Sequence, residues 1–419
     1  MKIVFYLDFA NMKSGGIYPY AKGVLGSLLA CKDIETLYLI HIDSQIPEDL
    51  KALLSSDKIV LVPFNKHNKI SKIRFLLSHF LMNTYHIYRK DFEAVSLGFS
   101  TERIKEIAIR LNPLRKIINA LDADVVHIPF QVSPVYGINK PLVLTVHDVQ
   151  ELYFPQFFSS EERMKRSIYV KIAVEESDQI VVWFDHVKQD VERFFNKDKS
   201  AVAVAMPNVL NDWYLGIDAN KWESIEEKYA LHENYLFYPS ATWQHKNHIK
   251  LLEALAILLG KGLDIYLYCT GHCTEFFPEI EQKMRDLNLE NRVKFLGIVP
   301  IADLLALYKN AKLLVLPSLY EGGGIPVFEA MRMEVPLVCS NIYAYRQSVS
   351  NIDLMFDPLS AQSIADIILK FCEDGEFKKM NLKNSKDRLS YFDQIKFSDN
   401  FIKAYNNAIK NKEVKRIRM

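Results

Sequence analysis

Residues 313–341 constrain the fold most, because they read as a strand, a glycine-rich loop, a helix and a second strand. Residues 313–316 form a short apolar run of the buried-strand type, and residues 322–324 are consecutive glycines. Pro326 suits the first turn of a helix, where its missing N–H costs nothing. Glycines let a backbone approach a ligand closely, and the free N–H groups of a helix N-terminus attract anions. We therefore expect an α/β fold with an anion site at this loop.

Two carboxylates, Glu321 and Glu329, bracket the loop and the first helical turn. Acidic residues beside an anion site make sense when the ligand also carries hydroxyl groups, which a carboxylate accepts well. A nucleotide sugar has both, because it joins a diphosphate to a ribose and a hexose. Glycine-rich turns between a strand and a helix are also common in α/β proteins that bind no phosphate. The geometry of this segment alone therefore leaves both interpretations open.

Short apolar runs alternate with helical segments twice along the chain, which predicts two doubly wound domains with parallel sheets. A length of 419 residues suits two or three domains of ordinary size. We expect an N-terminal domain over residues 1–206 and a C-terminal domain over 207–392. Residues 207–229 lose periodicity and predict a linker. Residues 393–419 predict a last helix and a basic tail.

The N-terminal domain carries candidate ligand-binding residues in two places. Gly15 and Gly16 lie between a predicted strand at 2–7 and a predicted helix at 17–30, where the backbone can meet a ligand. His147 and Asp148 follow a predicted strand at 141–146, at the edge where open α/β sheets bind ligands. A histidine there can donate a hydrogen bond to a sugar or phosphate, or it can be a satisfied interior residue.

The C-terminal domain adds a lysine and two further glycines. Lys246 follows a predicted strand at 235–238 and can reach a diphosphate with its ammonium group, although lysine at the start of a helix is commonplace. Gly271 and Gly297 each follow a predicted strand and are candidates for a nucleobase pocket. Glycine after a strand is generic, so both are weak candidates.

Several of these residues form segments that resemble the motifs of a known family. Glu321, the glycines, Pro326 and Glu329 resemble the Glu-x7-Glu signature of retaining GT-B glycosyltransferases, especially glycosyltransferase family 4. The segment YPSATWQHKNHIKLLEAL resembles the phosphate-binding lysine segment of that family, most closely in bacterial polysaccharide mannosyltransferases. The segment TVHDVQELYFPQFFS resembles its His-Asp segment. The family usually has an arginine shortly before the lysine, where this chain offers Ser240, Thr242 and His245.

The resemblance implies a GT-B fold, with two Rossmann-like domains facing a cleft and a C-terminal helix that returns to the first domain. The N-terminal domain would bind the acceptor, and the C-terminal domain would bind the nucleotide sugar. The implied activity is a retaining, metal-independent hexosyl transfer to a lipid-linked or polysaccharide acceptor, as in surface glycan and lipopolysaccharide synthesis. GDP-mannose is the expected donor, and a UDP-sugar is the main alternative. We expect no cofactor.

The resemblance also implies roles for individual residues. His147 would lie beside the donor hexose, Lys246 at the diphosphate and Glu321 near the hexose, so these three form the expected catalytic set. Asp148 and Tyr153 would lie on the acceptor side, and Glu329 would accept hydrogen bonds from the ribose hydroxyls. The expected donor-binding set is Gly15, Gly16, Lys246, Gly271, Gly297, Glu321, Gly322, Gly323, Gly324, Ile325, Val327 and Glu329.

The net charge of +1 argues against a general polyanion binder, but the charge is uneven. Residues 66–116 contain 11 basic and 4 acidic residues. A predicted helix at 66–88 carries its basic residues among apolar positions, which fits either an anionic membrane surface or a core-packing helix with a solvated face. Those basic residues are Lys66, Lys69, Lys72 and Arg74. The tail offers a second basic cluster: Lys410, Lys412, Lys415, Arg416 and Arg418.

Other features bear on location and metals. Five cysteines, mostly in apolar runs, predict reduced thiols and a cytoplasmic protein, peripheral on the inner face of the cell membrane if the basic helix binds lipid. The N-terminus reads as a strand, without the apolar core of a signal peptide. The triplet Asp122-Ala123-Asp124 opens a predicted strand, at the wrong end for a ligand, so we interpret it as structural. No nucleic-acid partner and no metal site are expected.

Two classes of alternative to a transferase share the expected fold: a silent binding relative, and an epimerase or phosphorylase. A catalytically silent GT-B relative would serve as a binding subunit, and its signal would be loss of His147, Lys246 or either glutamate, all of which are present. A sugar-nucleotide epimerase would show a different acidic pattern in the first domain. A phosphorylase would need a pyridoxal lysine and a longer chain.

Overall fold

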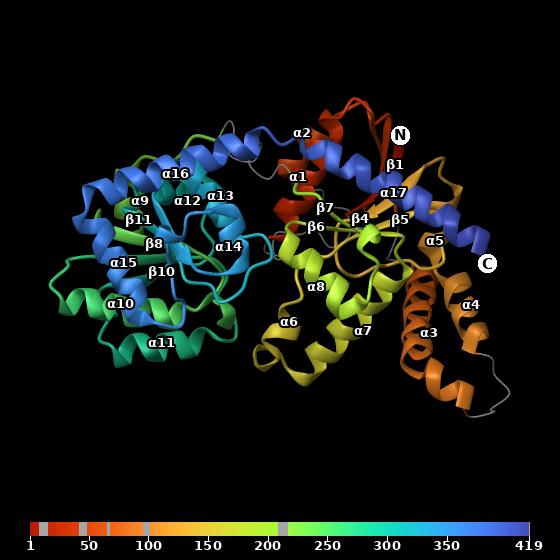
Figure 1. The fold of residues 1–419 in the computed structure, drawn as a ribbon, viewed down its shortest axis with the longest axis horizontal. Helices are drawn as coiled ribbons and strands as arrows, with labels where there is room; N and C mark the ends of the chain where they lie inside the picture. Colours follow the sequence, from red (N-terminus) through yellow and green to blue (C-terminus); the bar gives the residue numbers. More distant parts are fainter. Residues whose placement is uncertain (8–15, 42–47, 65–67, 95–100, 208–216, 419) are drawn as a thin grey trace. The chain divides into compact units, whose positions relative to one another are not determined.

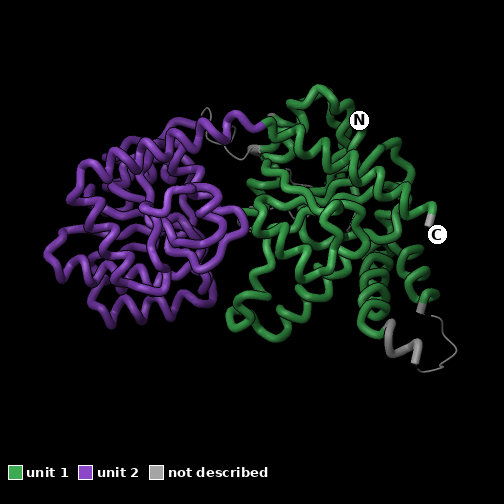
Figure 2. Tube along the Cα trace, viewed as in Figure 1, with its two compact units in different colours: residues 1–209, 396–419 green, residues 210–395 purple. Residues whose placement is uncertain are grey.

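The chain folds into two compact units. Unit 1 comprises Met1–Val209 and Lys396–Met419, and unit 2 comprises Leu210–Ile395 (Figure 2). Each unit has its own parallel sheet and its own apolar core, so the predicted α/β architecture with two doubly wound sheets is confirmed. The structure, a computed structural model, describes residues 1–7, 16–41, 48–64, 68–94, 101–207 and 217–418.

Unit 1 contains a seven-stranded sheet in the order β3-β2-β1-β4-β5-β6-β7, in which every paired strand is parallel. Its strands are β1 (Lys2–Tyr6), β2 (Thr36–His41), β3 (Ile59–Pro63), β4 (Val125–Ile128), β5 (Leu142–Thr145), β6 (Gln179–Val182) and β7 (Val202–Val204). The strand order reverses between β1 and β4. In open α/β sheets, this is the position where ligands bind, beyond the carboxyl ends of the strands.

The helices of unit 1 join these strands (Figure 1). They are α1 (Ile17–Ala30), α2 (Glu48–Leu54), α3 (Lys69–Ala94), α4 (Thr101–Leu111), α5 (Pro113–Ala120), α6 (Gln150–Tyr153), α7 (Ser160–Glu176), α8 (Asp185–Phe195) and α17 (Phe397–Arg418). Strands β4, β5 and β6 are buried along their whole length, as expected for strands covered on both faces. Helix α7 starts with a capping box in which Ser159 and Glu162 satisfy each other's backbone N–H groups.

Unit 2 contains a six-stranded parallel sheet in the order β10-β9-β8-β11-β12-β13. Its strands are β8 (Tyr235–Pro239), β9 (Tyr266–Thr270), β10 (Val293–Phe295), β11 (Leu313–Leu316), β12 (Leu337–Ser340) and β13 (Met355–Phe356). Its helices are α9 (Trp222–Tyr229), α10 (His248–Gly260), α11 (Phe277–Asp286), α12 (Ile301–Asn310), α13 (Ile325–Arg332), α14 (Tyr343–Ser348), α15 (Ala361–Glu373) and α16 (Gly375–Asp393). The order reverses between β8 and β11, which places the switch point of this sheet between those two strands.

The structure corrects the predicted linker at residues 207–229. Its second half forms α9, which is part of unit 2. Ile225 of α9 is buried, and Lys228 and Tyr229 both bond to the buried carboxylate of Asp303 on α12. A helix of only eight residues gives too short a periodic pattern to be predicted. Helices α2, α4, α5, α14 and α16 were also absent from the prediction, and α3 extends beyond the predicted residue 88.

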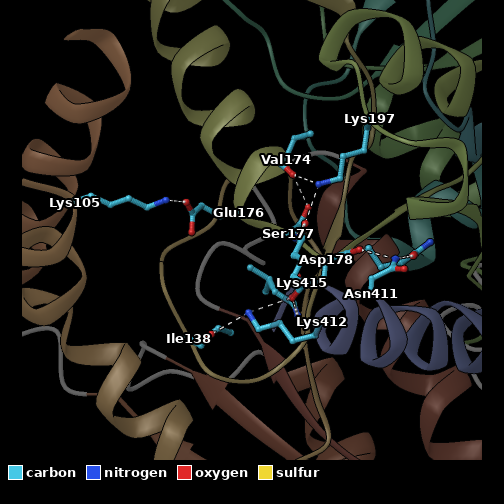
Figure 3. A network of polar contacts seen from close by, with 12 residues as sticks. Lys105, Ile138, Val174, Glu176, Ser177, Asp178, Lys197, Asn411, Lys412 and Lys415 are labelled. Carbon is cyan, nitrogen blue, oxygen red and sulfur yellow. Dashed lines mark hydrogen bonds and ion pairs between the residues drawn. The ribbon is translucent and has the colours of Figure 1, made fainter. Parts of the chain in front are cut away.

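The basic tail is part of α17 and is anchored to unit 1. Residues on one face of α17 are buried, including Phe401 and Tyr405, and the helix contacts β4 to β7. Near its end, Lys415 lies 2.8 Å and Lys412 lies 3.5 Å from the carboxylate of Asp178, which is buried just before β6 (Figure 3). Arg416 also donates to a backbone carbonyl. Three of the five cations that we considered for lipid contact are therefore engaged within the protein.

Candidate functional site

The loops that follow β8 and β11 meet at the switch point of unit 2. The backbone N–H of Leu319 donates to the carbonyl of His245 at 2.8 Å. The side-chain amide of Asn247 donates to the carbonyls of Pro317, at 2.9 Å, and Pro358, at 2.8 Å. Asn247 itself adopts a left-handed conformation with φ 62°. These bonds fix the segment that carries Lys246 against the segment that carries Glu321.

Lys246 and Glu321 form an ion pair at this position. The Lys246 Nζ lies 2.6 Å from Glu321 Oε1, and the two side chains are only 18% and 12% exposed. The same carboxylate oxygen accepts hydrogen bonds from Ser318 Oγ at 2.8 Å and from the Tyr345 hydroxyl at 3.3 Å. The Tyr238 hydroxyl donates to the Lys246 carbonyl at 2.9 Å. The ammonium group is therefore held at a defined point, with its charge balanced by one carboxylate.

The glycine loop turns from Glu321 into α13 through Gly324. This residue has φ +67°, a left-handed conformation that disfavours any side chain. A Cβ atom there would also lie 2.8 Å from Cε1 of Tyr345. Helix α13 starts without a side-chain cap on its N-terminal N–H groups, and Pro326 lies in its first turn. The uncapped helix start therefore lies directly after Glu321, where its dipole favours negative charge.

Glu329 lies one turn into α13 and is buried, with 8% of its surface exposed. Its Oε2 accepts a short hydrogen bond from the hydroxyl of Tyr308 on α12. Burial, and then the charge of Glu329, raise the pKa of Tyr308 well above its usual value, so the phenol remains a hydrogen-bond donor. Tyr308 thus fixes the orientation of the Glu329 carboxylate.

Gly271 and Gly297 join two neighbouring loops at the same edge of the sheet. The N–H of Gly271 donates to the carbonyl of Gly297 at 2.8 Å. Gly271 has φ +125°, and a Cβ atom there would lie 2.6 Å from the carbonyl carbon of Ser240. Close backbone packing therefore accounts for this glycine. Gly297 has φ +67° with nothing within 4 Å of a Cβ position, so only its conformation calls for glycine.

In unit 1, His147 lies at the carboxyl end of β5. Its Nε2 lies 3.0 Å from the carbonyl of Pro129, which follows β4, so Nε2 carries the proton and donates it. The ring of Tyr20 packs edge-on against it with centroids 4.7 Å apart. Burial lowers the pKa of His147, while the charge of Asp148 and the bond to Pro129 oppose that shift. His147 is therefore a neutral imidazole that is held in one orientation.

A chain of buried hydrogen bonds begins at Tyr20, whose ring packs against His147. The Tyr20 hydroxyl lies 3.1 Å from Thr145 Oγ1, which lies 3.0 Å from Nε2 of His127. The other ring nitrogen of His127 lies 2.8 Å from the hydroxyl of Tyr405 on α17. Burial lowers the pKa of His127 to about 3. The chain therefore contains no net charge at neutral pH, and it ties the C-terminal helix to the edge that carries His147.

Two family descriptions match this chain, one in each unit. Residues 88–206 match the family model described as Glycosyltransferase Family 4, and residues 220–388 match the one described as Glycosyl transferases group 1. The match in unit 2 covers the whole sheet from β8 to β13 with its switch point, and the match in unit 1 covers strands β4 to β7. The chain belongs to the GT-B glycosyltransferases of the family 4 type.

Curated relatives of this glycosyltransferase include enzymes of O-antigen assembly. The chain is 27% identical over 215 residues to the O-antigen chain mannosyltransferase RfbU of Salmonella typhimurium. This match covers 51% of the chain and 56% of RfbU. The chain is 25% identical over 267 residues to O-antigen chain mannosyltransferase B of Escherichia coli, which covers 63% of this chain and 69% of that protein. The match thus spans a little over half the length of the first relative and about two thirds of the second.

Solved structures share the GT-B fold of this glycosyltransferase. Anabaena HepE, solved in complex with UDP and glucose, superimposes with a TM-score of 0.60 at 14% identity, and the match covers 100% of both chains. WaaG, a glycosyltransferase involved in lipopolysaccharide biosynthesis, superimposes with a TM-score of 0.61 at 15% identity over 98% of this chain and 99% of that one. At such identities the likeness concerns the fold alone.

The structure brings several of the predicted donor residues of the glycosyltransferase together. Lys246, Glu321 and the glycine loop meet at the switch point of unit 2, with Glu329 one turn further along α13. Of the three residues that stand in for the family arginine, Thr242 is buried and bonded to Thr274. The hydroxyl of Thr242 is therefore used in a structural contact between two loops of unit 2.

Unit 1 contains four other predicted positions: Tyr153, Asp148, Gly15 and Gly16. The hydroxyl of Tyr153 donates to Asp190 on α8 at 2.5 Å, although 42% of Tyr153 is exposed. Asp148 accepts a 3.4 Å bond from the N–H of Gln150. Gly16 is the residue before α1, with φ −66°, whereas Gly15 lies outside the described residues. The acceptor-side and glycine-loop assignments in unit 1 stay predictions.

The Asp-x-Asp triplet is structural, as we expected. Asp124 Oδ2 accepts a bond from the backbone N–H of Lys2 at 2.7 Å, and Asp122 Oδ2 lies 2.8 Å from the Lys2 Nζ. Both contacts lie at the amino-terminal edge of the sheet, where β1 and β4 begin.

Sequence reasoning missed the side chains that hold the catalytic candidates. Tyr308, Tyr345 and Tyr238 occupy apolar positions of helices or strands and look like ordinary core residues. Only the tertiary contacts show that their hydroxyl groups point to Glu329, Glu321 and the Lys246 segment. A buried tyrosine usually needs a partner for its hydroxyl, which is the one signal that could have pointed to them.

Proposed function

We propose that this glycosyltransferase moves a hexose, with retention of anomeric configuration, from a nucleoside diphosphate sugar to a lipid-linked or polysaccharide acceptor. GDP-mannose is the donor that we favour, because the relatives RfbU and mannosyltransferase B carry mannosyltransferase names. The observation that carries the proposal is the Lys246–Glu321 pair, which lies beside an uncapped helix start at the switch point of unit 2. We place the reaction in surface glycan synthesis, on the cytoplasmic face of the cell membrane.

The proposed chemistry breaks the anomeric C–O bond, and the bonding electrons go to the leaving diphosphate. The acceptor hydroxyl attacks on the face from which the diphosphate departs, and we assign no covalent nucleophile. Negative charge then grows on a phosphate oxygen, where a fixed cation and helix N–H groups stabilise it most. Lys246 and the first turn of α13 supply this positive charge, so the proposal requires no metal ion.

Binding of the donor changes the surroundings of Lys246. In the structure its charge is balanced by Glu321, which also accepts bonds from Ser318 and Tyr345. We propose that the diphosphate replaces Glu321 as the partner of the Lys246 ammonium group, while the Glu321 carboxylate turns to accept bonds from hexose hydroxyls. Ser318 and Tyr345 keep Glu321 in place during this exchange. The N–H groups of Gly323, Gly324 and Ile325 are the proposed contacts to the hexose and phosphate. The N–H of Val327, which we also expected to bind the donor, already donates to the Gly324 carbonyl at 3.0 Å.

Glu329 is the proposed ribose contact, because a carboxylate can accept bonds from two vicinal hydroxyls. Its bond from Tyr308 holds the carboxylate in a fixed orientation. This arrangement disfavours a two-carboxylate hydrolase mechanism, in which both carboxylates flank one anomeric carbon. Gly271, Gly297 and the turn around them are the proposed base pocket.

Unit 1 contributes the proposed sugar and acceptor contacts. His147 presents its unprotonated Nδ1 as an acceptor, because Nε2 donates to Pro129. A neutral imidazole that accepts a bond suits a sugar hydroxyl better than a phosphate oxygen. Asp148 and Tyr153 stay the proposed acceptor-side residues, and Gly15 and Gly16 the proposed glycine loop.

Thermal shift against nucleotide sugars tests the proposal. A ligand at 100 times its dissociation constant stabilises the folded state by about 2.7 kcal/mol, so the cognate donor should raise the Tm by roughly 5–10 °C. We expect GDP-mannose to give the largest shift, and its incubation with acceptor to release GDP. HepE was solved with UDP and glucose, which makes a UDP-sugar the second candidate. A shift without nucleotide release, with any acceptor preparation, would identify a silent binding subunit.

A further inference from the structure

Helix α3 has two apolar faces, and the core of unit 1 uses only one of them. On the inner face, Met82 and Tyr85 are buried in a small cluster with Ala108 of α4, Tyr136 and Ile172. Figure 1 shows α3 and α4 side by side, reaching away from the strands of unit 1. The inner face thus satisfies the packing needs of the helix, and a second apolar face has no role in that core.

The outer face carries large apolar side chains in solvent. Ile70 is 69% exposed, Ile73 63%, Leu76 58% and Phe80 65%, and Leu77 and Ile87 are also exposed. At about 100° per residue these positions fall within an arc of about 120°, and they form a stripe about 25 Å long. The solvent face of a surface helix is ordinarily polar. A contiguous apolar stripe of this size marks an interaction surface. We call these six residues the α3 stripe.

Over residues 69–88, which contain the α3 stripe, the charges have one sign, whereas residues 89–94 of the same helix include two basic and two acidic residues. Residues 69–88 include three cations and no aspartate or glutamate. Lys69 and Lys72 are exposed, and Arg74 is exposed while it donates to the carbonyl of Arg110. On a helical projection, Lys72 and Arg74 flank the stripe on opposite sides. Apolar residues bordered by cations complement an anionic lipid surface, in which acyl chains lie beneath negative headgroups.

Contacts on the inner side fix α3 and α4 in place, so the stripe residues are not free to rotate into the core of unit 1. Ser78 Oγ donates to the carbonyl of Ala108 at 2.7 Å. The Tyr136 hydroxyl lies 2.6 Å from Nδ1 of His79. Lys105 of α4 pairs with Glu176 of α7 at 2.9 Å (Figure 3).

We infer that the α3 stripe docks into the headgroup region of an anionic lipid bilayer, with α3 lying in the plane of the membrane. Among the described residues, no helix is long and apolar enough to cross a bilayer. Of the C-terminal cations, Lys412 and Lys415 pair with Asp178, so we assign the main lipid contact to α3. This inference goes beyond the proposed transfer reaction and does not depend on the identity of the donor.

Sedimentation of the full chain with lipid vesicles tests the inference. The wild-type chain should bind vesicles of phosphatidylglycerol mixed with phosphatidylcholine at low salt, and bind pure phosphatidylcholine much more weakly. Ile73→Ser with Phe80→Ser should weaken binding to the anionic vesicles about 10- to 100-fold, because two large side chains no longer enter the lipid. Lys69→Gln with Lys72→Gln should weaken it about 25-fold at low salt and less at high salt.

A matched control uses apolar residues of similar exposure in unit 2. Ile352 is 62% and Leu359 is 70% exposed, so Ile352→Ser with Leu359→Ser removes a comparable amount of apolar surface and should leave vesicle binding unchanged. Each variant is also tested for its Tm and for the thermal shift by the donor, which should stay as in the wild type. This second readout separates failure of the lipid proposal from failure of the transferase proposal.

Three outcomes would overturn the inference. The first is a wild-type chain that does not sediment with anionic vesicles. The second is binding that survives both the apolar and the basic substitutions. The third is a wild-type dimer that ignores vesicles and becomes monomeric with Ile73→Ser and Phe80→Ser, because the stripe would then be an interface between two copies of the chain.

Discussion

The two sheets have the same topology at their switch points but differ in the polar groups there. The edge of unit 2 holds a charged pair, Lys246 and Glu321, together with a left-handed turn at Gly324. The edge of unit 1 holds a neutral imidazole, His147, above a buried chain without net charge. A doubly wound sheet therefore fixes where a ligand binds, while the side chains placed there decide what kind of ligand.

The difference follows from the cost of holding charge in a partly buried place. An isolated cation there would be expensive, so Lys246 is balanced by Glu321, which has two further donors. In such a pair Lys246 can exchange the Glu321 carboxylate for another anion, and a diphosphate is such an anion. The edge of unit 1 offers the carboxylate of Asp148 and the oriented neutral imidazole of His147 but no cation among the described residues, which suits sugar hydroxyls better than a diphosphate. The comparison thus predicts unequal effects of mutation at the two edges.

The largest effect should come from Lys246→Ala, with His147→Gln as its counterpart in unit 1. Loss of a preorganised group that stabilises charge in the transition state typically lowers kcat about 100- to 1000-fold. Loss of one neutral hydrogen bond at His147 should lower kcat/KM only about 2- to 10-fold. Steady-state kinetics with the cognate donor would measure both. Equal losses would contradict the assignment of the charged role to unit 2, and wild-type turnover in Lys246→Ala would remove the phosphate role.

Next in size is the effect of Glu329→Ala on donor binding. A bond to a charged group contributes about 1.5–3 kcal/mol, so the KM for the donor should rise about 10- to 100-fold. Tyr308→Phe removes only the bond that orients the carboxylate, so its KM should rise by a smaller factor. Initial rates over a range of donor concentrations would separate the two. An unchanged KM in Glu329→Ala would exclude the ribose contact.

Buried histidines in both units predict a loss of stability in acid. Burial lowers the pKa of His127 and that of His248 to about 3, against an ordinary value of 6.5. Between these values the unfolded chain binds a proton that the folded chain does not, so stability falls as pH drops below about 6.5. By pH 5 the loss is about 2 kcal/mol for each histidine.

The two histidines differ in their partners, which allows a matched test. The ring nitrogens of His248 have no hydrogen-bond partner among the described residues, whereas His127 bonds to Thr145 and Tyr405. His248→Phe should therefore change stability little at pH 7 and reduce the loss between pH 7 and pH 5 by about 2 kcal/mol. His127→Phe should cost about 1–3 kcal/mol at pH 7, because both hydroxyl partners lose a bond. Urea unfolding at the two pH values measures this, and an identical pH dependence in wild type and His248→Phe would contradict the burial argument.

The smallest effect concerns the glycine turns of unit 2. Gly297→Ala keeps φ near +67° with open space around the new Cβ, so it should cost about 1 kcal/mol, or roughly 2–4 °C in Tm. Gly324→Ala adds a clash with Tyr345, so it should cost more and should also disturb the Tyr345 bond to Glu321. We expect only Gly324→Ala to raise the KM for the donor. Equal Tm shifts, with no change in KM for either variant, would remove the link between the turn and the Glu321 network.

Much of the fold was predictable because the central strands of each sheet are short and fully buried, as β4, β5, β6, β11 and β12 are. Their continuous apolar runs and the helices between them stand out in the sequence, as at β8 and α10. Some elements that escaped prediction carry weak patterns, such as the short helix α9. Helix α3 was predicted, but its sequence is apolar on two faces and does not reveal which face is buried.

The sequence by itself determined the two parallel sheets, the glycine loop, and the residue types Lys246, Glu321, Glu329 and His147 that chemistry on a nucleotide sugar would need. Local propensity and residue spacing suffice to predict these features, because the features depend on residues that are close in the sequence. Only the tertiary structure decided that Lys246 pairs with Glu321 across 75 residues, that Tyr308 and Tyr345 hold the two glutamates, and that the basic tail is pinned to Asp178. These contacts join distant segments, and their energies depend on burial, which exists only after the chain has folded.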